Sequence, residues 1–460
     1  MFDYIIIGGG VVGTAMAREL SKYDITIGLI EKESDVSLGA SKANSGIVHG
    51  GYAGKYGTLK GDLCIKGNRM YDELNHELNF GFKRVGGLII GFEGDEEVLK
   101  LQYENGLKVG EEMIWLDKNQ VLALEPEINP HVSSAIHVPM IGITSPYEMT
   151  IALMENAIEN GVKLLLNHKV LDIEFDNCYK INTSLGTVES RFVINAAGLY
   201  SDEIHKMLGG SGLKILPRRG QYVLFSKEEN KLNHVIFQTP TDKGKGILVT
   251  PTLHGNLMIG PDAEDLFDEI ETETSVERLE SILRQGKKSV DFFNPKKAIT
   301  TFSGIRAMSE NKDFFIEYVS EHSITVGGID SPGLTSAPAI ACHVVEMIKE
   351  KQNLTLKKDF NPTRSSYFEI ENDDLVCLCE SQGKNRILAC LEGPIEIKST
   401  DAVKRRIRAG MGMCQGRRCE QKVRQIIADY HHVDQALITK RTEKTMPKRV
   451  GINDIRKLEI

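Results

Sequence analysis

The first thirty residues alternate short apolar runs with a glycine-rich turn. Phe2–Ile7 is largely apolar and ends in three glycines, Val11–Tyr23 carries small and apolar residues at helical spacing, and Asp24–Glu31 contains a second apolar run. Apolar runs bounded by glycine are typical of strands buried on both faces. The pattern therefore predicts a β-turn-α-β unit with two parallel strands.

The same two patterns continue to about residue 360. Helical spacing predicts helices over residues 61–80, 96–110, 145–161 and 334–349. Apolar runs predict strands over residues 86–91, 163–166, 169–175, 192–195 and 323–327, and a second, mostly antiparallel set over residues 217–225, 246–250 and 256–259. The Gly/Ser/Asn-rich segment Ser37–Gly57 is too long for a mere connector, which indicates a functional loop.

Composition then restricts the class of protein. With 460 residues, 41% of them hydrophobic and 26% charged, the chain is expected to be an ordinary globular protein of two or three domains. Its 56 lysines and arginines against 64 aspartates and glutamates give a net charge of −8, so we expect no binding to nucleic acid. No apolar run reaches the roughly 18 residues of a membrane span, and no signal peptide is seen. We therefore expect a cytoplasmic protein, with any membrane association through a partner.

The character of the chain changes near Asn361. An acidic cluster over residues 369–374 is followed by five of the eight cysteines, four of them in two close pairs, and residues 401–450 carry 13 basic against 5 acidic side chains. These shifts predict a separate module over residues 361–460. The basic stretch is more typical of a solvated or partner-facing surface than of a nucleic-acid site, and we expect it to be a docking face.

The glycine turn matches the G-x-G-x-x-G pattern at Gly8, Gly10 and Gly13, and Glu31 ends the following strand. The first glycine permits a tight turn, the second lets a diphosphate approach the backbone, and the third lets helix and strand pack closely. The helix N-terminus attracts the anion, and Glu31 is placed to accept hydrogen bonds from a ribose. The unit therefore predicts a dinucleotide site.

Later segments favour FAD over NAD as the dinucleotide. The small polar loop Ser41–Gly51 is suited to lie against a flat ring system, and Val193–Gly198 and Val326–Thr335 are strand-then-glycine junctions far apart in the chain. FAD is long, and its isoalloxazine ring lies well away from its adenosine, so segments far apart in the chain are needed to contact both ends. The sequence has no second G-x-G-x-x-G motif for a nicotinamide nucleotide.

The C-terminal cysteines form two close pairs in the sequence, Cys377 with Cys379 and Cys414 with Cys419. Four thiolates so spaced can enclose zinc or an iron–sulfur cluster. Cys390 lies between the pairs as an alternative ligand. The remaining cysteines lie in apolar surroundings and are expected to be core thiols: Cys64, Cys178 and Cys342.

These motifs resemble known families. The glycine turn, Asn44–Gly51, Val193–Gly198 and Gly304–Arg306 are similar to the FAD-dependent oxidoreductases related to D-amino acid oxidase, over residues 1 to about 350. Within them, the resemblance is closest to the large subunit of anaerobic glycerol-3-phosphate dehydrogenase and to L-2-hydroxyglutarate dehydrogenase. The cysteine segment resembles the [2Fe–2S] module of bacterioferritin-associated ferredoxin, as fused to the glycerol-3-phosphate enzymes.

The resemblance implies an α/β fold of three parts. An FAD-binding Rossmann-type domain (about residues 1–80, 145–215 and 320–360) is interleaved with an antiparallel-sheet substrate domain (about 81–144 and 216–319). A small, mostly helical cysteine-cluster domain follows, over residues 361–460. The implied FAD contacts are Gly8, Gly10, Gly13, Glu31, Lys32, Ser41, Ser45, Gly46, Val170, Ala197, Gly198, Gly328, Gly333, Leu334 and Thr335. The implied [2Fe–2S] ligands are Cys377, Cys379, Cys414 and Cys419.

Two residues are expected to act on the substrate. His49 lies in the loop expected to pass the flavin, and an imidazole with a pKa of about 6.5 suits proton transfer. Arg306 aligns with the arginine that relatives use to hold a carboxylate or phosphate. Tyr52, Arg219 and Tyr222 are weaker candidates for the substrate side. The N-terminus of the helix that begins near Gly333 would stabilise negative charge on the reduced flavin.

The expected reaction is oxidation of sn-glycerol 3-phosphate by hydride transfer to flavin, with electrons passing through the iron–sulfur module to a companion subunit. Oxidation of L-2-hydroxyglutarate and a role as a non-catalytic flavin relay remain alternatives. Two departures matter. The phosphate-binding lysine of the Gly-Gly-Lys-x-x-Thr run in the glycerol-3-phosphate family is absent from Gly328–Thr335, and the final cysteine pair is C-x4-C, unlike the C-x2-C of the stand-alone ferredoxin.

Overall fold

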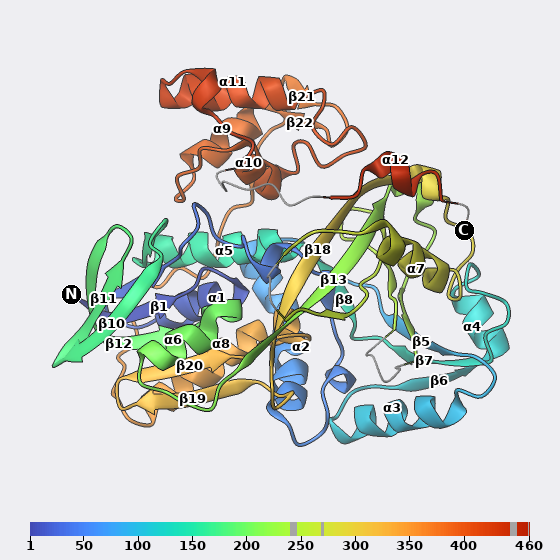
Figure 1. Cartoon of the computed structure of the whole chain (residues 1–460), viewed down its shortest axis with the longest axis horizontal. Coiled ribbons are helices and arrows are strands. Elements are labelled where there is room, and N and C mark those ends of the chain that lie inside the picture. Colours follow the sequence, from blue (N-terminus) through green and yellow to red (C-terminus); the bar gives the residue numbers. More distant parts are fainter. Residues whose placement is uncertain (240–245, 268–270, 442–448, 459) are drawn as a thin grey trace.

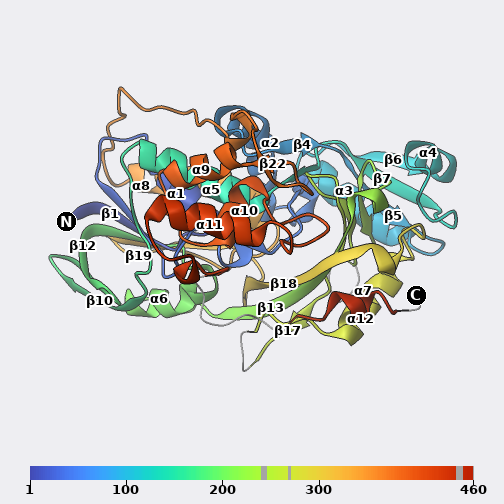
Figure 2. The ribbon, with the colours of Figure 1, turned by 90° about the horizontal axis from the view of Figure 1, so that it is seen from above.

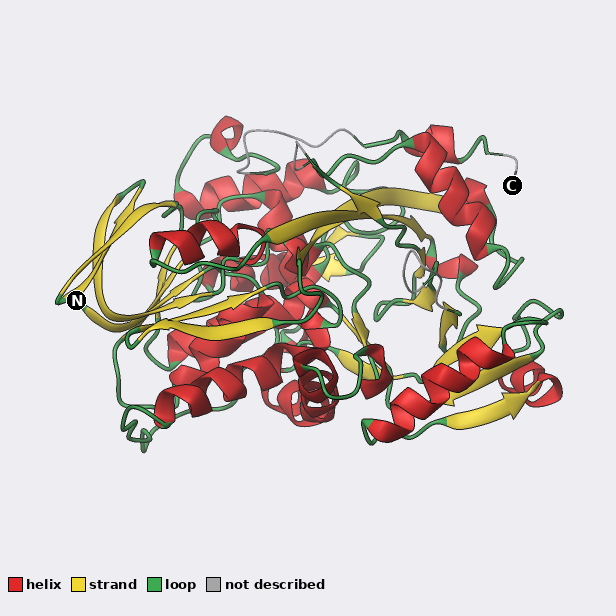
Figure 3. Ribbon diagram, turned by 60° about the horizontal axis from the view of Figure 1, so that its bottom comes forward, coloured by secondary structure: helices red, strands yellow, loops and turns green. Residues whose placement is uncertain are grey.

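Two large β-sheets form the body of the molecule in the computed structural model, which describes residues 1–239, 246–267, 271–441, 449–458 and 460 (Figures 1 and 3). The first sheet centres on β1 (Phe2–Ile7), which pairs in parallel with β2 (Ile27–Ile30) and β12 (Gly186–Asn195). β20 (Ser323–Gly327) pairs in parallel with β12. Because these strands run the same way, their carboxyl ends meet at one edge of the sheet.

Helices cover both faces of this sheet. The side chains of β1 alternate, so Tyr4 and Ile6 join the core of one face while Ile5 and Ile7 join the core of the other. The first core contains α1 (Val11–Leu20), α2 (Leu59–Leu78), α5 (Pro146–Glu159) and α8 (Gly333–Lys349), and the second contains α6 (Ser201–Met207). The outer strands are β9 (Lys163–Leu165), β10 (Val170–Asp176), β11 (Cys178–Thr183) and β19 (Phe315–Ser320).

The second sheet is built from residues 87–138 and 215–309, between segments of the first. Its long strands β13 (Ile215–Phe225) and β18 (Ala298–Ser309) pair antiparallel along nearly their whole length. The other strands are β5 (Gly87–Gly91), β6 (Ile114–Asp117), β7 (Ser134–Val138), β14 (Val235–Gln238), β15 (Val249–Pro251), β16 (Leu257–Ile259) and β17 (Glu264–Asp265). Of the pairings described in this sheet, β5 with β14 alone is parallel. The expected α/β fold with a mostly antiparallel second sheet is confirmed.

Smaller elements complete the two-sheet body. The flanking helices are α3 (Glu96–Lys108), α4 (Lys118–Leu124) and α7 (Val276–Gly286). The short strands β3 (Ile47–Val48), β4 (Phe82–Arg84) and β8 (Gly142–Thr144) form a three-stranded sheet. None of the helices described is both long enough and apolar enough to span a membrane.

Several strands differ from the sequence-based expectation, among them β11, β14 and β19, and the longest of these strands are β12 and β18. β12 begins at Gly186 rather than near residue 192, because its first half pairs with the β10–β11 ribbon and alternates exposed and covered residues. β18 was not expected, because buried and half-buried residues alternate along it and no continuous apolar run marks it. Both strands depend on cross-strand partners that are distant in sequence.

The C-terminal part is mostly helical, as expected. It contains α9 (Lys384–Glu392), α10 (Thr400–Ile407) and α11 (Glu420–His431), with a hairpin of β21 (Leu375–Cys377) and β22 (Gln382–Gly383). Seen from above, these elements lie over α1 and α5 (Figure 2). The chain then returns to the second sheet, where α12 (Ile452–Ile455) contacts α7 and β18 (Figure 1).

Buried ion pairs hold the C-terminal part against the first sheet and its helices. Arg405 and Arg406 of α10 pair with Asp35 at 2.7 and 2.9 Å, and Arg364 pairs with Glu155 of α5 at 2.6 Å. Arg406 also lies 3.6 Å from Glu155, so the pairs form one network. Each of these side chains is at most 8% exposed. Because buried charges are stable only when closely paired, the network fixes where the C-terminal domain sits.

Replacement of Asp35 is predicted to weaken the contact between the C-terminal domain and the rest of the molecule. Asp35→Asn leaves two buried guanidinium groups without their carboxylate, and we expect a loss of about 3–5 kcal/mol in the free energy of unfolding. Asp3→Asn is the matched control, because the Asp3–Arg191 pair is exposed and is worth about 0–1 kcal/mol. Urea unfolding measures both losses; equal losses would contradict the assignment.

The same carboxylate predicts a pH dependence. Burial opposes ionisation of Asp35, but Arg406 and Arg405 outweigh it and lower its pKa from 3.8 to about 2. Because the folded pKa is the lower one, this stabilisation is fully present above pH 3.8 and is lost as the pH falls toward 2. Urea unfolding at a series of pH values should therefore show a smaller acid-induced loss for Asp35→Asn than for the wild type.

Candidate active site and cysteine cluster

One cavity of about 1750 Å³ lies between the carboxyl edge of the first sheet, strands β13 and β18, and the C-terminal domain. It collects residues from all three parts of the chain. The expected site residues that line it are Gly8, Gly10, Glu31, Lys32, Ser41, Ser45, Gly46, His49, Ala197, Gly198, Arg306, Gly333 and Leu334. Four others are absent from its lining: Gly13, Val170, Gly328 and Thr335.

The start of α1 opens onto this cavity. Gly10 is its N-cap, and Gly10, Val11 and Val12 line the wall, so N–H groups of the first turn, which have no carbonyl partner within the helix, can hold an anion there. The Val11 N–H donates to Ser41 Oγ at 2.9 Å. Gly8 has φ of +115°, and a Cβ there would lie 2.4 Å from the Ala196 carbonyl oxygen. A diphosphate therefore fits this turn.

Gly13 acts through packing. A Cβ at Gly13 would lie 2.0 Å from the Gly8 carbonyl oxygen, so only glycine lets α1 approach the turn this closely. This is the helix–strand packing role predicted for the third glycine of the motif.

Glu31 directly follows β2 and lies at the cavity wall. Its Oε2 accepts from the Gly9 N–H at 2.6 Å and its Oε1 from the Glu33 N–H at 2.9 Å. Burial raises the pKa of Glu31, and the two N–H donors act against that rise. Beside it, the Lys32 ammonium lies 4.0 Å from the centre of the Tyr200 ring. The fixed carboxylate suits the ribose hydroxyls of an adenosine.

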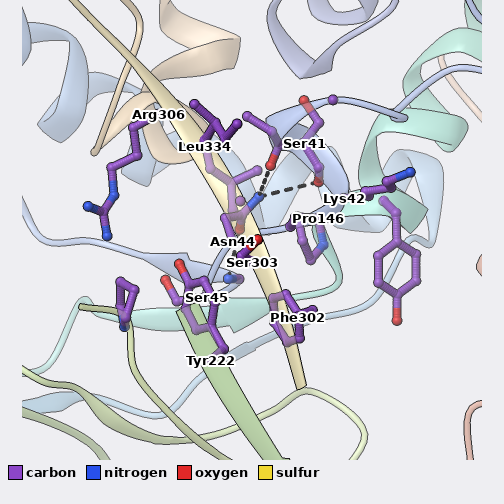
Figure 4. Close-up of a pocket in the computed structure, with 18 of the residues that line it drawn as sticks. Ser41, Lys42, Asn44, Ser45, Pro146, Tyr222, Phe302, Ser303, Arg306 and Leu334 are labelled. Atoms are coloured by element: carbon purple, nitrogen blue, oxygen red, sulfur yellow. Dashed lines mark hydrogen bonds between the residues drawn. The ribbon is translucent and has the colours of Figure 1, made fainter. Parts of the chain in front are cut away.

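The opposite wall is formed by β13 and β18 (Figure 4). The Tyr222 and Phe302 rings stack 4.6 Å apart at 11°. Arg306 Nη2 donates to the Asp262 carbonyl at 3.3 Å, and a Cβ on Gly220 would lie 2.8 Å from that nitrogen. Burial raises the pKa of Tyr222, and Arg306 opposes the rise. Gly220 thus makes room for a guanidinium group in the cavity wall.

Two of the weaker substrate-side candidates do not line the cavity. Arg219 points to the other side of β13, where it pairs with Glu264 at 2.7 Å, because strand side chains alternate and Arg218 takes the cavity side. Tyr52 is buried with its ring edge-on to Phe237. Tyr222 is the one candidate of the three that lines the cavity.

His49 is held in the cavity wall through its backbone. Its N–H donates to Thr335 Oγ1 at 2.9 Å, and its carbonyl accepts from Asn68 Nδ2 at 2.8 Å. Its ring packs 5.8 Å from that of Phe237. Thr335 belongs to the first turn of α8, so the predicted base and the predicted helix N-terminus are tied together.

The first turn of α8 also faces the cavity. Gly333 and Leu334 line it, and the Leu334 carbonyl accepts from the Tyr71 hydroxyl at 2.6 Å. Just before the helix, Asp330 forms an ion pair with Lys60 of α2. The N–H groups of this turn can stabilise negative charge on a ligand.

Sequence reasoning missed one wall of the cavity. The C-terminal domain contributes Asp401, Lys404, Arg405, Arg408, Met411, Gln415, Arg441 and Arg449. Tyr147, in the first turn of α5, was also missed. Its place after the helix-starting Ser145-Pro146 gives no sign of a ligand-facing role. No local pattern marks these residues, because docking of the domain brings them to the cavity.

The four predicted ligand cysteines come together as two pairs, Cys377 with Cys419 and Cys379 with Cys414. Contact with Cys419 and the Gly410 N–H, 3.4 Å from Cys377 Sγ, lowers the pKa of Cys377 to about 6 against the effect of burial. Such N–H···S contacts are typical of thiolates in iron–sulfur sites.

Their geometry bears on the choice of metal. Within the described parts of the chain, no three His, Cys, Asp or Glu side chains converge to hold a single metal ion. The thiols also influence one another across the two pairs, Cys377 with Cys414 and Cys414 with Cys419, so all four lie close enough to be ligands of one two-iron cluster. The alternative ligand Cys390 is buried on α9, near Arg406, Glu155 and Arg364.

Comparison with known proteins agrees with both halves of the site. Residues 3–347 match the family model described as FAD dependent oxidoreductase, and residues 375–429 match the BFD-like [2Fe–2S] binding domain. A glycerol 3-phosphate dehydrogenase from Caloramator mitchellensis is 45% identical, over 93% of this chain and 94% of its own length. An L-2-hydroxyglutarate dehydrogenase from Escherichia coli K12 is 30% identical, over 68% of this chain and 72% of its own.

A solved structure shows the same architecture with its cofactor. The FAD-bound L-alpha-glycerophosphate oxidase from Mycoplasma pneumoniae superposes with a TM-score of 0.75 at 30% identity, covering 79% of this chain and 98% of that one. The resemblance predicted from the sequence motifs is confirmed. The chain belongs to the FAD-dependent oxidoreductases, and it carries a BFD-like [2Fe–2S]-binding domain at its C-terminal end.

Proposed function

We propose that the protein is a dehydrogenase that oxidises sn-glycerol 3-phosphate to dihydroxyacetone phosphate. The observation that carries this proposal is the 45% identity to a glycerol 3-phosphate dehydrogenase along 93% of the chain, the cysteine domain included. The cavity supports it, because it combines a dinucleotide-binding turn with an imidazole and a guanidinium group, His49 and Arg306.

Three features of the chain would hold FAD. The start of α1 takes the diphosphate, Glu31 accepts from the ribose hydroxyls, and the first turn of α8 stabilises negative charge on the flavin. When bound, FAD supplies the oxidant, because its N5 atom accepts hydride from the carbon that carries the hydroxyl group. Lys32 and Tyr200 form a stacked pair beside Glu31 on the adenosine side.

Two residues would act on the substrate itself. An imidazole nitrogen of His49 accepts the proton of the reacting hydroxyl, and its backbone contacts with Thr335 and Asn68 fix its position. Arg306 binds the phosphate with two parallel N–H donors. The relatives' phosphate-binding lysine is absent from the last glycine junction, where this chain instead has Asp330 in an ion pair with Lys60. We therefore assign the main phosphate contact to Arg306.

The C-terminal domain supports a dehydrogenase rather than an oxidase. The glycerophosphate oxidase structure is covered over 98% of its own length by only 79% of this chain, so an oxidase of this type is complete without a cysteine domain. We propose that a [2Fe–2S] cluster on the four cysteines takes electrons from the flavin. A companion electron-transfer subunit then accepts them, and any attachment to a membrane is through that partner.

An anaerobic titration tests the substrate. Purified protein should lose its visible flavin absorbance on addition of glycerol 3-phosphate and keep it with L-2-hydroxyglutarate, because the 45% identity along 93% of the chain is to a glycerol 3-phosphate dehydrogenase. Bleaching by L-2-hydroxyglutarate alone would assign the alternative reaction. Failure of both compounds to bleach a bound flavin would indicate a relay subunit without its own substrate.

Substitution tests the two proposed roles. His49→Gln should lower kcat by about 10²–10⁴-fold, because the proton acceptor is lost. Arg306→Lys should raise KM by roughly 10- to 100-fold, because lysine cannot make the paired contact. Arg219→Lys is the matched control, since that arginine lies off the cavity, and it should leave both constants near wild type. Steady-state kinetics with an artificial acceptor measure all three; equal effects of the two arginine changes would contradict the assignment.

The choice of electron acceptor gives an independent test. Turnover with a one-electron dye should exceed turnover with O₂, because an iron–sulfur relay serves no purpose if oxygen reoxidises the flavin directly. Dye reduction and oxygen uptake measured on the same preparation decide this. Equal rates would identify an oxidase.

A further inference from the structure

Arg408 joins the cysteine-bearing loop to the cavity wall. It is the C-cap of α10 and has a left-handed backbone, with φ of 64°, a conformation that favours glycine or asparagine. A bulky residue persists there only when its surroundings hold it, and such strain is common at functional sites. The side chain of Arg408 is 8% exposed, so it is held inside the structure.

The contacts of Arg408 run in two directions. Toward the cysteines, Nε donates to Glu380 Oε2 at 3.0 Å, and Glu380 directly follows the ligand Cys379. Toward the cavity, Nη1 donates to the Tyr147 hydroxyl at 3.3 Å. Tyr147 in turn donates to Met411 Sδ at 3.2 Å. Tyr147, Arg408 and Met411 all line the cavity.

The contacts next to the cysteines are also held in place by neighbouring residues. Two residues beyond Arg408, the Gly410 N–H donates to Cys377 Sγ at 3.4 Å. Glu380 is 5% exposed and is paired a second time, with Lys227 at 3.2 Å, from the end of β13. Two of the four ligand cysteines are therefore linked to the cavity through packed atoms. The buried pairs around Asp35 and Glu155 hold this arrangement in place.

We propose that Arg408 is a positioning residue that sets the path of electrons from flavin to cluster within one chain, across Tyr147 and Met411. The proposal rests on the proposed function, since it requires both cofactors. The rate of electron transfer falls steeply with distance and is higher through packed atoms than across a gap. A domain held in fixed contact with the cavity therefore transfers electrons faster than a domain that moves relative to it.

Each step moves one electron from reduced flavin to oxidised cluster. Two steps, separated by reoxidation of the cluster by a one-electron acceptor, restore oxidised flavin and release its protons to solvent.

The test measures this transfer without using substrate. The flavin of the anaerobic holoprotein is reduced by a light flash with EDTA as the electron donor, and the appearance of reduced cluster is followed by absorbance and confirmed by electron paramagnetic resonance. Arg408→Met should slow the transfer by about tenfold or more, because small displacements of a positioned group have large effects on rate. Tyr147→Phe, which keeps the ring and removes the hydroxyl, should also slow it. Arg417→Met is the matched control, since Arg417 is an exposed arginine of the same loop, and it should transfer at the wild-type rate.

The outcomes separate the two proposals. A wild-type rate that does not depend on protein concentration, with slower transfer in the two variants at equal FAD and iron content, supports the path. If Arg408→Met loses its iron, Tyr147→Phe alone decides. The proposed path would be overturned if the variants that keep their cofactors transfer electrons as fast as the wild type. It would also be overturned if the rate in the wild type rises with protein concentration. Absence of iron from the wild-type protein would instead refute the part of the proposed function that places a [2Fe–2S] cluster on the four cysteines.

Discussion

The parallel pairing of β1 with β2 and β12 is the constraint on which the site depends. Because these strands and β20 run in one direction, their carboxyl ends bring Gly8, Glu31, Ala197 and the start of α8 to one edge. The close approach of Gly8 to Ala196 and of Gly13 to Gly8 leaves no room for a side chain at either glycine. Two helix N-termini thus open onto one cavity, and in the proposed function one takes the diphosphate and the other stabilises the flavin.

The second sheet completes the cavity by strand alternation. On β13, Arg218 and Tyr222 face the cavity while Arg219 faces away, and on β18 Arg306 crosses the gap left by Gly220. A rigid antiparallel pair is a suitable support for the guanidinium group, since its position is set by the register of two long strands. The proposed substrate side therefore lies on a different sheet from the proposed dinucleotide side, and the chain passes between the two sheets more than once.

Charge pairing decides where the third part sits. The C-terminal domain could have been a tethered module, but Arg405, Arg406 and Arg364 are buried against Asp35 and Glu155. Such pairs add little net stability compared with an apolar interface, yet they are costly to break, so they favour a single docked arrangement. The same domain supplies one wall of the cavity, which places the cysteine loop beside the ligand site.

The sequence by itself determined the elements whose information is local. The glycine turn and Glu31 lie within one short unit, the strands β1, β2 and β20 are apolar runs, and the cysteine spacing marks its own module; all of these appear where expected. Only the tertiary structure decided which residues meet across the chain. It assigned Arg219 and Tyr52 away from the cavity, extended β12, revealed β18, and brought Tyr147 and Arg408 together. The reason is physical: local periodicity records which face of an element is buried, whereas the partner on that face is set by packing and charge contacts between segments hundreds of residues apart.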